Sequence, residues 1–307
     1  MEASAKDTAP SGKDSSTTET WTVLRLLEWT TDFFKRKGSS SPRLDAEVLL
    51  AHARNCERIE LYTAFNEEPT EEQRVAFREM IRRRGEGVPV AQLVGHKEFY
   101  SLSLRVDEHT LIPRPETEHL VIKAIDQIKD LHPSIHDRPI HVADIGTGSG
   151  AIAIAIASSV QFVEVFATDL SSDALEIAKW NAEKLGVAAR IKFSIGDLFE
   201  AITEGVQFDV ICSNPPYVSE SEFETLDPVV RNHEPKSALV SGPTGTETIK
   251  RLLEQAKDRL RENGSILIEL SPMIGGQCVQ IAQDLEYRDV QLIKDLAGLN
   301  RVLAARR

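Results

Sequence analysis

The sequence predicts an α/β fold in which a doubly wound, mostly parallel sheet of seven strands follows a small all-helical domain and a β-hairpin linker. Three observations predict this architecture. Apolar residues recur with a helical period from residue 20 to residue 86, and the period shifts towards two from there to residue 115. From Ile140 onwards short apolar strands alternate with helices, which is typical of a parallel sheet covered on both faces.

The N-terminal part divides into a tail and a helical domain. Residues 1–19 are polar, rich in Ser and Thr and poor in large apolar groups. We expect a disordered tail there, because such a segment cannot offset the entropy of ordering. In the helical domain, residues 20–86, Ser41 and Pro42 predict the cap and first turn of a helix. The stretch "TEEQ" at residues 70–73 is a capping box that opens another helix.

A hairpin linker is expected over residues 87–115. In "FYSLSLRVD" the apolar residues Leu102, Leu104 and Val106 alternate with polar ones, as in a half-buried strand. The strand ends at "LIPRPETE", because its two prolines prevent continued pairing, and the glutamates that follow begin a helix. The sheet is then carried by the last domain, residues 116–307.

Strands and helices follow one another regularly in this last domain. Strands are predicted at residues 140–144, 163–168, 191–194, 207–213, 265–270, 289–293 and 301–305, and helices at 150–159, 172–185 and 246–262, the last two closed by Gly186 and Gly264. Ligands of such sheets bind beyond the carboxyl ends of the strands. Polar residues at those ends are therefore the candidates for a functional site.

Composition excludes several classes of protein. The longest apolar run, Ala151 to Ala157 with Val160, is far shorter than the roughly 20 residues of a membrane helix. The net charge of -12 repels polyanions, so we expect no direct contact with nucleic acid. The three cysteines are scattered and fit no metal-binding spacing. We therefore expect no metal site and a reducing, cytoplasmic environment.

A glycine turn follows the first predicted strand. In "DIGTGSGAIAIAIA" glycines stand at positions 146, 148 and 150, immediately before a helix of small residues. They allow the backbone to approach a ligand at the N-terminus of that helix. Since Ala151 also completes a G-x-G-x-x-A pattern, the turn by itself fits a dinucleotide as well.

Acidic residues mark the ends of three consecutive strands. Asp144 precedes the glycine turn, Asp169 ends the second strand and Asp197 ends the third. A carboxylate at Asp169 can accept hydrogen bonds from both hydroxyls of a ribose, and one at Asp197 can accept from an adenine amine that Leu198 and Phe199 cover. Together the three acids predict a single nucleoside pocket.

The fourth strand ends in the motif "SNPPY", residues 213–217. The side-chain carbonyl of Asn214 and the backbone carbonyl of Pro215 are two acceptors that can take both hydrogens of a planar NH2 group, because the prolines hold the loop extended. Tyr217 can stack on that flat group. The nitrogen of an amide or adenine is a poor nucleophile, so fixing it against a methyl donor lowers the barrier by positioning and electrostatics.

These motifs resemble the class I S-adenosylmethionine-dependent methyltransferases, whose catalytic domain is a Rossmann-like sheet, and within them the protein glutamine N5-methyltransferases that modify peptide-chain release factors. The resemblance covers nearly everything after residue 20, including "DIGTGSGAIAIAIA", "SNPPYV", "EPKSAL" and "DLAGLNRVL". Enzymes acting on a ribosomal protein carry a "VPRSP"-like segment where this chain reads "IPRPETE". The resemblance therefore implies methylation of the glutamine in the Gly-Gly-Gln motif of release factors, in translation termination. After the fifth strand the chain departs from the family pattern, with Ser271 and Pro272 where a glycine is usual.

The resemblance also implies roles for individual residues. The catalytic residues are Asn214, Pro215 and Tyr217, and with Pro216 and Phe99 they bind the substrate glutamine. Arg114 and Glu116 shape the pocket entrance. The S-adenosylmethionine-binding residues are Gly146, Thr147, Gly148, Ser149, Gly150, Asp169, Asp197, Leu198 and Asn214. The helical domain is then a surface for docking a release factor, and a monomer is expected.

Three alternatives remain at this point. The first is a glutamine methyltransferase that acts on a ribosomal protein, and the second is an adenine-N6 methyltransferase of nucleic acid, because the N-P-P-Y motif serves that chemistry too. The -12 charge and the absence of a long basic domain disfavour the second. The third is a non-catalytic adaptor that keeps its cofactor for stability, which the complete motif from Asn214 to Tyr217 disfavours.

Overall fold

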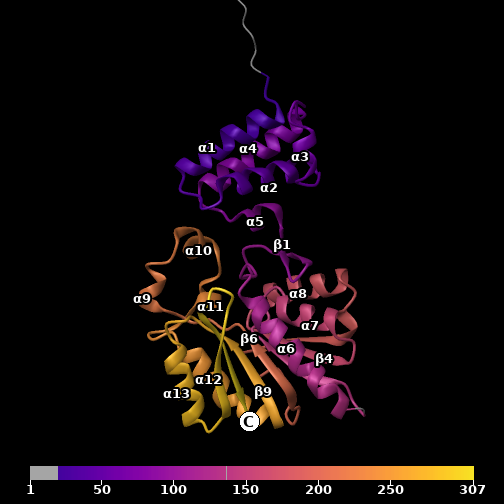
Figure 1. Cartoon of the computed structure of the whole chain (residues 1–307), viewed down its shortest axis with the longest axis vertical. Helices are drawn as coiled ribbons and strands as arrows, with labels where there is room; N and C mark the ends of the chain where they lie inside the picture. Colours follow the sequence, from indigo (N-terminus) through magenta and orange to yellow (C-terminus); the bar gives the residue numbers. More distant parts are fainter. Residues whose placement is uncertain (1–19, 136) are drawn as a thin grey trace, which may run out of the picture. The chain divides into compact units, whose positions relative to one another are not determined.

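The computed structural model describes residues 20–135 and 137–307, and it divides into one unit that ends at Gly85 and a second from Glu86 to Arg307 (Figure 1). The expected disordered tail, residues 1–19, lies outside the described residues. In the part of the chain that the structure describes, none of the helices combines the length and apolar character needed to cross a bilayer.

The first unit is helical. Its helices are α1 (Val23–Arg36), α2 (Pro42–Arg54), α3 (Glu60–Thr63) and α4 (Glu71–Gly85). Pro42 begins α2 as predicted, but the hydroxyl of Ser41 makes no capping hydrogen bond. The capping box of α4 is confirmed, since the Gln73 N–H donates to Thr70 Oγ1 at 3.3 Å and Gln73 Oε1 accepts from the Thr70 N–H at 3.0 Å.

The second unit opens with the predicted hairpin. After the short helix α5 (Val90–Val94), strand β1 (His96–Phe99) pairs antiparallel with β2 (Leu102–Arg105). Tyr100 and Ser101 connect them with φ angles of 50° and 59°. Positive φ at both central residues gives a turn whose twist matches that of the strands. The hairpin linker of the predicted fold is therefore confirmed.

A seven-stranded sheet forms the centre of this unit, in the order β10-β11-β9-β6-β3-β4-β5. The strands are β3 (Ile140–Ile145), β4 (Val163–Asp169), β5 (Ile191–Ile195), β6 (Phe208–Ser213), β9 (Leu260–Glu269), β10 (Arg288–Lys294) and β11 (Asn300–Arg306). All pairs from β5 to β9 are parallel, while β11 is antiparallel to both β9 and β10. The predicted doubly wound, mostly parallel sheet is confirmed. Its strand order reverses between β3 and β6, which is where such sheets bind ligands.

Helices cover both faces of the sheet, as Figure 1 shows. One face packs against α6 (Thr117–Leu131), α7 (Ala151–Ser159) and α8 (Ser172–Lys184), and the other against α12 (Glu247–Arg259) and α13 (Gly275–Asp284). Val142 and Val165 point to the first core, and Ile145 and Ile266 to the second. Alternate residues of one strand thus enter opposite cores, which explains the near-continuous apolar runs of these strands.

Some elements differ from the prediction. Helix α12 ends at Arg259 and β9 begins at Leu260, so Gly264 lies inside a strand and does not close the helix. A segment between β6 and α12 also holds short elements that the sequence does not predict, namely β7 (Val218–Ser219), α9 (Glu220–Phe223), α10 (Pro228–His233), α11 (Lys236–Leu239) and β8 (Val240–Gly242). They are too short to show a period. Residues of α11 and β8 line the cavity described next.

Candidate active site

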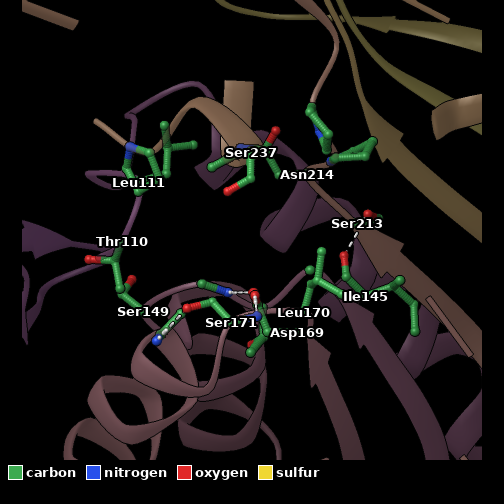
Figure 2. Close-up of a pocket in the computed structure, with 18 of the residues that line it drawn as sticks. Thr110, Leu111, Ile145, Ser149, Asp169, Leu170, Ser171, Ser213, Asn214 and Ser237 are labelled. Atoms are coloured by element: carbon green, nitrogen blue, oxygen red, sulfur yellow. Dashed lines mark hydrogen bonds between the residues drawn. The ribbon is translucent and has the colours of Figure 1, made fainter. Parts of the chain in front are cut away.

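A cavity of about 580 Å³ lies beyond the carboxyl ends of β3, β4, β5 and β6. Figure 2 shows Asp169 and Asn214 on opposite sides of it. The predicted residues that line the cavity are Gly146, Thr147, Gly148, Ser149, Asp169, Asp197, Leu198, Asn214, Pro215 and Pro216. Residues that are 70 positions apart in the sequence are therefore brought together, because parallel strands end at one edge of the sheet.

The glycine turn is held by hydrogen bonds to the neighbouring strand. The N–H groups of Gly146 and Thr147 both donate to the carbonyl of Thr168 at 2.9 Å, and the Gly148 N–H donates to Asp169 Oδ2 at 2.8 Å. Asp169 Oδ1 accepts from the Ser171 N–H at 2.9 Å (Figure 2). Burial raises the pKa of Asp169, and these N–H groups oppose that shift. Each carboxylate oxygen keeps a second lone pair, so Asp169 can still accept from hydroxyls in the cavity.

Asp144 does not face the cavity, which corrects the expectation of three acids in one pocket. It is fully buried, and its Oδ2 accepts from Thr147 Oγ1 at 2.6 Å and from the Ala153 N–H at 3.0 Å. Its role in the structure is to tie the glycine turn to the first turn of α7. Asp144 Oδ1 has no hydrogen-bond partner among the described residues.

The burial of Asp144 predicts a pH-dependent stability. Desolvation raises its pKa from 3.8 to about 7, so the folded state binds this proton more tightly than the unfolded state. The contribution of Asp144 to stability therefore falls as the pH rises through this window. We expect the wild type to lose about 2–3 kcal/mol of unfolding free energy from this group between about pH 5 and about pH 8.

Urea unfolding at both pH values checks this expectation. The Asp144→Asn variant should lack this part of the pH dependence, whereas Asp126→Asn, which changes an exposed carboxylate of α6, should keep it. An Asp144→Asn variant with the pH dependence of the wild type would contradict the buried titration.

The end of β5 supplies an acid and a strained backbone. Leu198 has a φ of 50°, and its carbonyl accepts from Thr168 Oγ1 at 2.9 Å. A residue other than glycine in the left-handed conformation is strained, and protein structures retain such strain mainly at functional sites. Asp197 Oδ2 lies 2.5 Å from Nη2 of Arg251, which also lines the cavity. The sequence analysis missed Arg251, because it stands on an otherwise unremarkable polar face of α12.

The loop after β6 carries the amide of Asn214. Ser213 Oγ donates to the carbonyl of Ile145 at 2.6 Å and so joins the ends of β6 and β3 (Figure 2). Asn214 Nδ2 donates to Thr117 Oγ1 at 3.3 Å. Within the described residues Asn214 Oδ1 has no hydrogen-bond partner, so it is available to a ligand. Thr117, which the sequence analysis did not single out, lines the cavity too.

Two predicted substrate-binding residues lie outside the cavity lining. Phe99 is 1% exposed, because β1 turns it into the core beside Leu104 and Leu120. Tyr217 directs its hydroxyl away to Glu269 Oε1, at 3.4 Å, and burial raises its pKa. Neither Phe99 nor Tyr217 is therefore part of the cavity lining. The structure does not show the predicted wall at Phe99 or the predicted stacking surface at Tyr217.

Of the two predicted entrance residues, Arg114 joins two loops by pairing with Glu234. Glu234 is buried, and its Oε1 lies 2.5 Å from Arg114 Nη2 while its Oε2 accepts from the Ile112 N–H at 3.1 Å. Pro113 and Pro235, next to these residues, line the cavity. Glu116 stands at the N-cap of α6. Glu234, a residue that the sequence analysis did not assign to the site, thus joins "LIPRPE" to "EPKSAL" at the cavity.

Two segments of the chain match known domain families. Residues 25–95 match the PrmC N-terminal domain and residues 128–234 match the Methyltransferase small domain. A release factor glutamine methyltransferase of Rhodopirellula baltica is 60% identical over 293 residues, which cover 95% of this chain and 98% of that protein. One of Bacillus anthracis is 35% identical over 285 residues, which cover 92% of this chain and 98% of that protein.

A solved structure has a similar fold. The hMettl16 catalytic domain, in complex with a MAT2A 3′UTR hairpin, aligns with a TM-score of 0.51 over 67% of this chain and 75% of that one. The sequence identity is 18%, so this similarity concerns the fold alone.

Proposed function

This chain belongs to the release factor glutamine methyltransferase family, and from that premise we propose that it transfers a methyl group from S-adenosylmethionine to N5 of the glutamine in the Gly-Gly-Gln motif of peptide-chain release factors. The observation that carries the proposal is the free carbonyl of Asn214, which shares one cavity with the glycine turn and Asp169. Family and geometry thus support the same reaction.

The residues of the cavity fit a nucleoside-containing methyl donor. The glycine turn leaves an open backbone at the N-terminus of α7, Asp169 keeps lone pairs for ribose hydroxyls, and Leu198 with Asp197 stands where an adenine would lie. When bound, S-adenosylmethionine supplies an electrophilic methyl group on a positively charged sulfur. Gly146 to Gly150, Asp169, Asp197 and Leu198 would hold it, and Asn214 would stand beside it.

The loop at Asn214 and Pro215 would hold the reacting amide. Asn214 Oδ1 and the Pro215 carbonyl accept one hydrogen each from the substrate NH2 group, which fixes its plane and its nitrogen. When the nitrogen takes up the methyl group it must lose one of its two protons, and that proton leaves to solvent. The two carbonyl oxygens stabilise the positive charge that develops on the N–H groups before this loss. Because an amide nitrogen is a weak nucleophile, this positioning and the two acceptor dipoles are the contributions that the chain can make.

The proposal extends to the partner and the compartment. The substrate is a protein that docks on the helical unit, and the enzyme acts as a monomer in the cytoplasm without direct contact with nucleic acid. The net charge of -12 supports the last point, because it repels polyanions. Asn214, Pro215 and Pro216 are proposed to bind the substrate glutamine.

Mass spectrometry tests the proposal directly. An unmodified release factor is incubated with the full chain and S-adenosylmethionine, and any added methyl group is mapped to a residue. We expect one methyl group on the Gly-Gly-Gln glutamine and none when that glutamine is changed to glutamate. Methyl transfer to a ribosomal protein or to nucleic acid instead, with the release factor unmodified, would overturn the proposed substrate.

A further inference from the structure

One cation of the cavity wall has no part in the function proposed above. Arg251 stands in the second turn of α12 and lines the cavity together with Thr248, which lies three positions before it on the same face of the helix. Its Nη2 donates to Asp197 Oδ2 at 2.5 Å, and the two side chains are 50% and 36% exposed. Ion pairs as exposed as this one contribute little to the stability of a fold. Its place in the cavity therefore points to a role towards a ligand.

The backbone around Asp197 is held by the neighbouring strand. The Gly196 N–H donates to the carbonyl of Asp169 at 3.0 Å. On the other side Leu198 is left-handed, with a φ of 50°, and its carbonyl accepts from Thr168 Oγ1 at 2.9 Å. The carboxylate of Asp197 is not fixed by these bonds, because the last torsion of an aspartate side chain is broad.

Arg251 supplies the constraint that the backbone lacks. Within residues 20–135 and 137–307, its N–H group makes the one hydrogen bond to the Asp197 carboxylate, and it takes Oδ2. Oδ1 is left without a partner on the chain and is the oxygen that a ligand in the cavity can use. An ionised carboxylate only accepts hydrogen bonds. Arg251 therefore holds a pure acceptor in one orientation at the wall of the cavity.

The next residue offers a donor. Leu198 lines the cavity, and its N–H makes no hydrogen bond within the described part of the chain. Asp197 Oδ1 and this N–H match the edge of adenine, where an amine donates and the adjacent ring nitrogen accepts. Hypoxanthine has the opposite pattern, with an oxygen in place of the amine and a hydrogen on the ring nitrogen. A site built to bond an N–H group rejects an analogue that lacks it.

We propose that Arg251 is a positioning residue that sets the base selectivity of the cofactor site, because it holds Asp197 with Oδ1 towards the amine of adenine. The inference rests on the proposed function, since it takes the nucleoside of the cavity to be that of S-adenosylmethionine. Without Arg251 the carboxylate can turn away and bind water. Adenine then loses affinity, and the oxygen of hypoxanthine no longer meets a fixed negative charge.

Calorimetry with two ligands that differ only in the base tests the proposal. S-adenosylhomocysteine and S-inosylhomocysteine are titrated into the full chain of the wild type and of Arg251→Met, which keeps an unbranched apolar side chain and removes the charge. We expect the dissociation constant of S-adenosylhomocysteine to rise about 10-fold and that of S-inosylhomocysteine to change less than about twofold. Lys250→Met is the matched control, because Lys250 is an exposed cation of α12 outside the cavity lining, and it should bind both ligands as the wild type does.

A double-mutant cycle shows whether Arg251 acts through Asp197. In an Asp197→Ala background, Arg251→Met should change the dissociation constant of S-adenosylhomocysteine by less than about twofold further. An additive loss would overturn the positioning role. So would wild-type affinity in Arg251→Met, or an equal loss for the two ligands, which is the result expected if Arg251 only supports the local structure.

The outcomes separate this inference from the proposed function. A wild-type chain that binds neither ligand would overturn both the proposed cofactor and the role of Arg251. A loss in Arg251→Met that is confined to the adenine ligand would support the role of Arg251 whether or not the wild type methylates a release factor. The substrate and the base selectivity are thus tested by different measurements.

Discussion

The Asn214→Ala variant is expected to retain the cofactor and to lose most of its turnover, with kcat lower by about 10²- to 10³-fold. The side chain provides one of two acceptors for the substrate NH2 group, and its loss leaves that group free to rotate out of the reacting geometry. The one hydrogen bond of its side chain among the described residues is to Thr117, so little of the fold depends on it.

Single-turnover kinetics and calorimetry measure the two parts of this expectation. The dissociation constant for S-adenosylmethionine should change less than about threefold, because the glycine turn and Asp169 are untouched. Gln161→Ala, which removes an exposed amide from the segment directly before β4, is the matched control and should behave as the wild type. Retained turnover in Asn214→Ala would disprove the role of the amide in holding the substrate.

Local signals in the sequence predicted the parts of the site that lie within one turn of the chain. The glycine turn needs residues that tolerate positive φ, and "SNPPY" needs prolines that hold it extended. In both motifs the residue types therefore indicate the local backbone conformation directly. The strands of the sheet could also be predicted from the sequence, because turn-forming residues mark the ends of their apolar runs. Asp169, Asp197 and Asn214 followed from their places at strand ends.

Contacts between distant segments could not be predicted in this way. Thr117 and Asn214 are separated by 97 positions, and Asp197 and Arg251 by 54. The role of Phe99 as a wall of the pocket came from the resemblance alone, and the structure places this residue in the hydrophobic core. Helix α13 escaped prediction because it opens with Gly275 and Gly276, which are weak helix formers.

Gly150 is the position at which the fold itself should be most sensitive. It has a φ of +84° at the start of α7, and a Cβ atom there would lie 2.7 Å from Ile154 Cδ1 and 3.3 Å from the backbone Cα of Ala178. The Ile154 side chain can move, but the backbone of α8 cannot move without disturbing its packing. Gly150→Ala should therefore combine the cost of a left-handed residue, about 1–2 kcal/mol, with overpacking of about 1–3 kcal/mol.

Gly148→Ala separates these two costs. Gly148 is also left-handed, with a φ of +55°, but a Cβ atom there would meet nothing within 4 Å. Urea unfolding can be followed by the fluorescence of Trp180 in α8, once Trp21 and Trp29 are replaced by Phe. We expect Gly148→Ala to lose about 1–2 kcal/mol and Gly150→Ala about 3–4 kcal/mol of unfolding free energy. Equal losses would mean that backbone conformation alone requires glycine at residue 150, and a larger loss in Gly150→Ala would show that the close approach of α7 to α8 also excludes a side chain there.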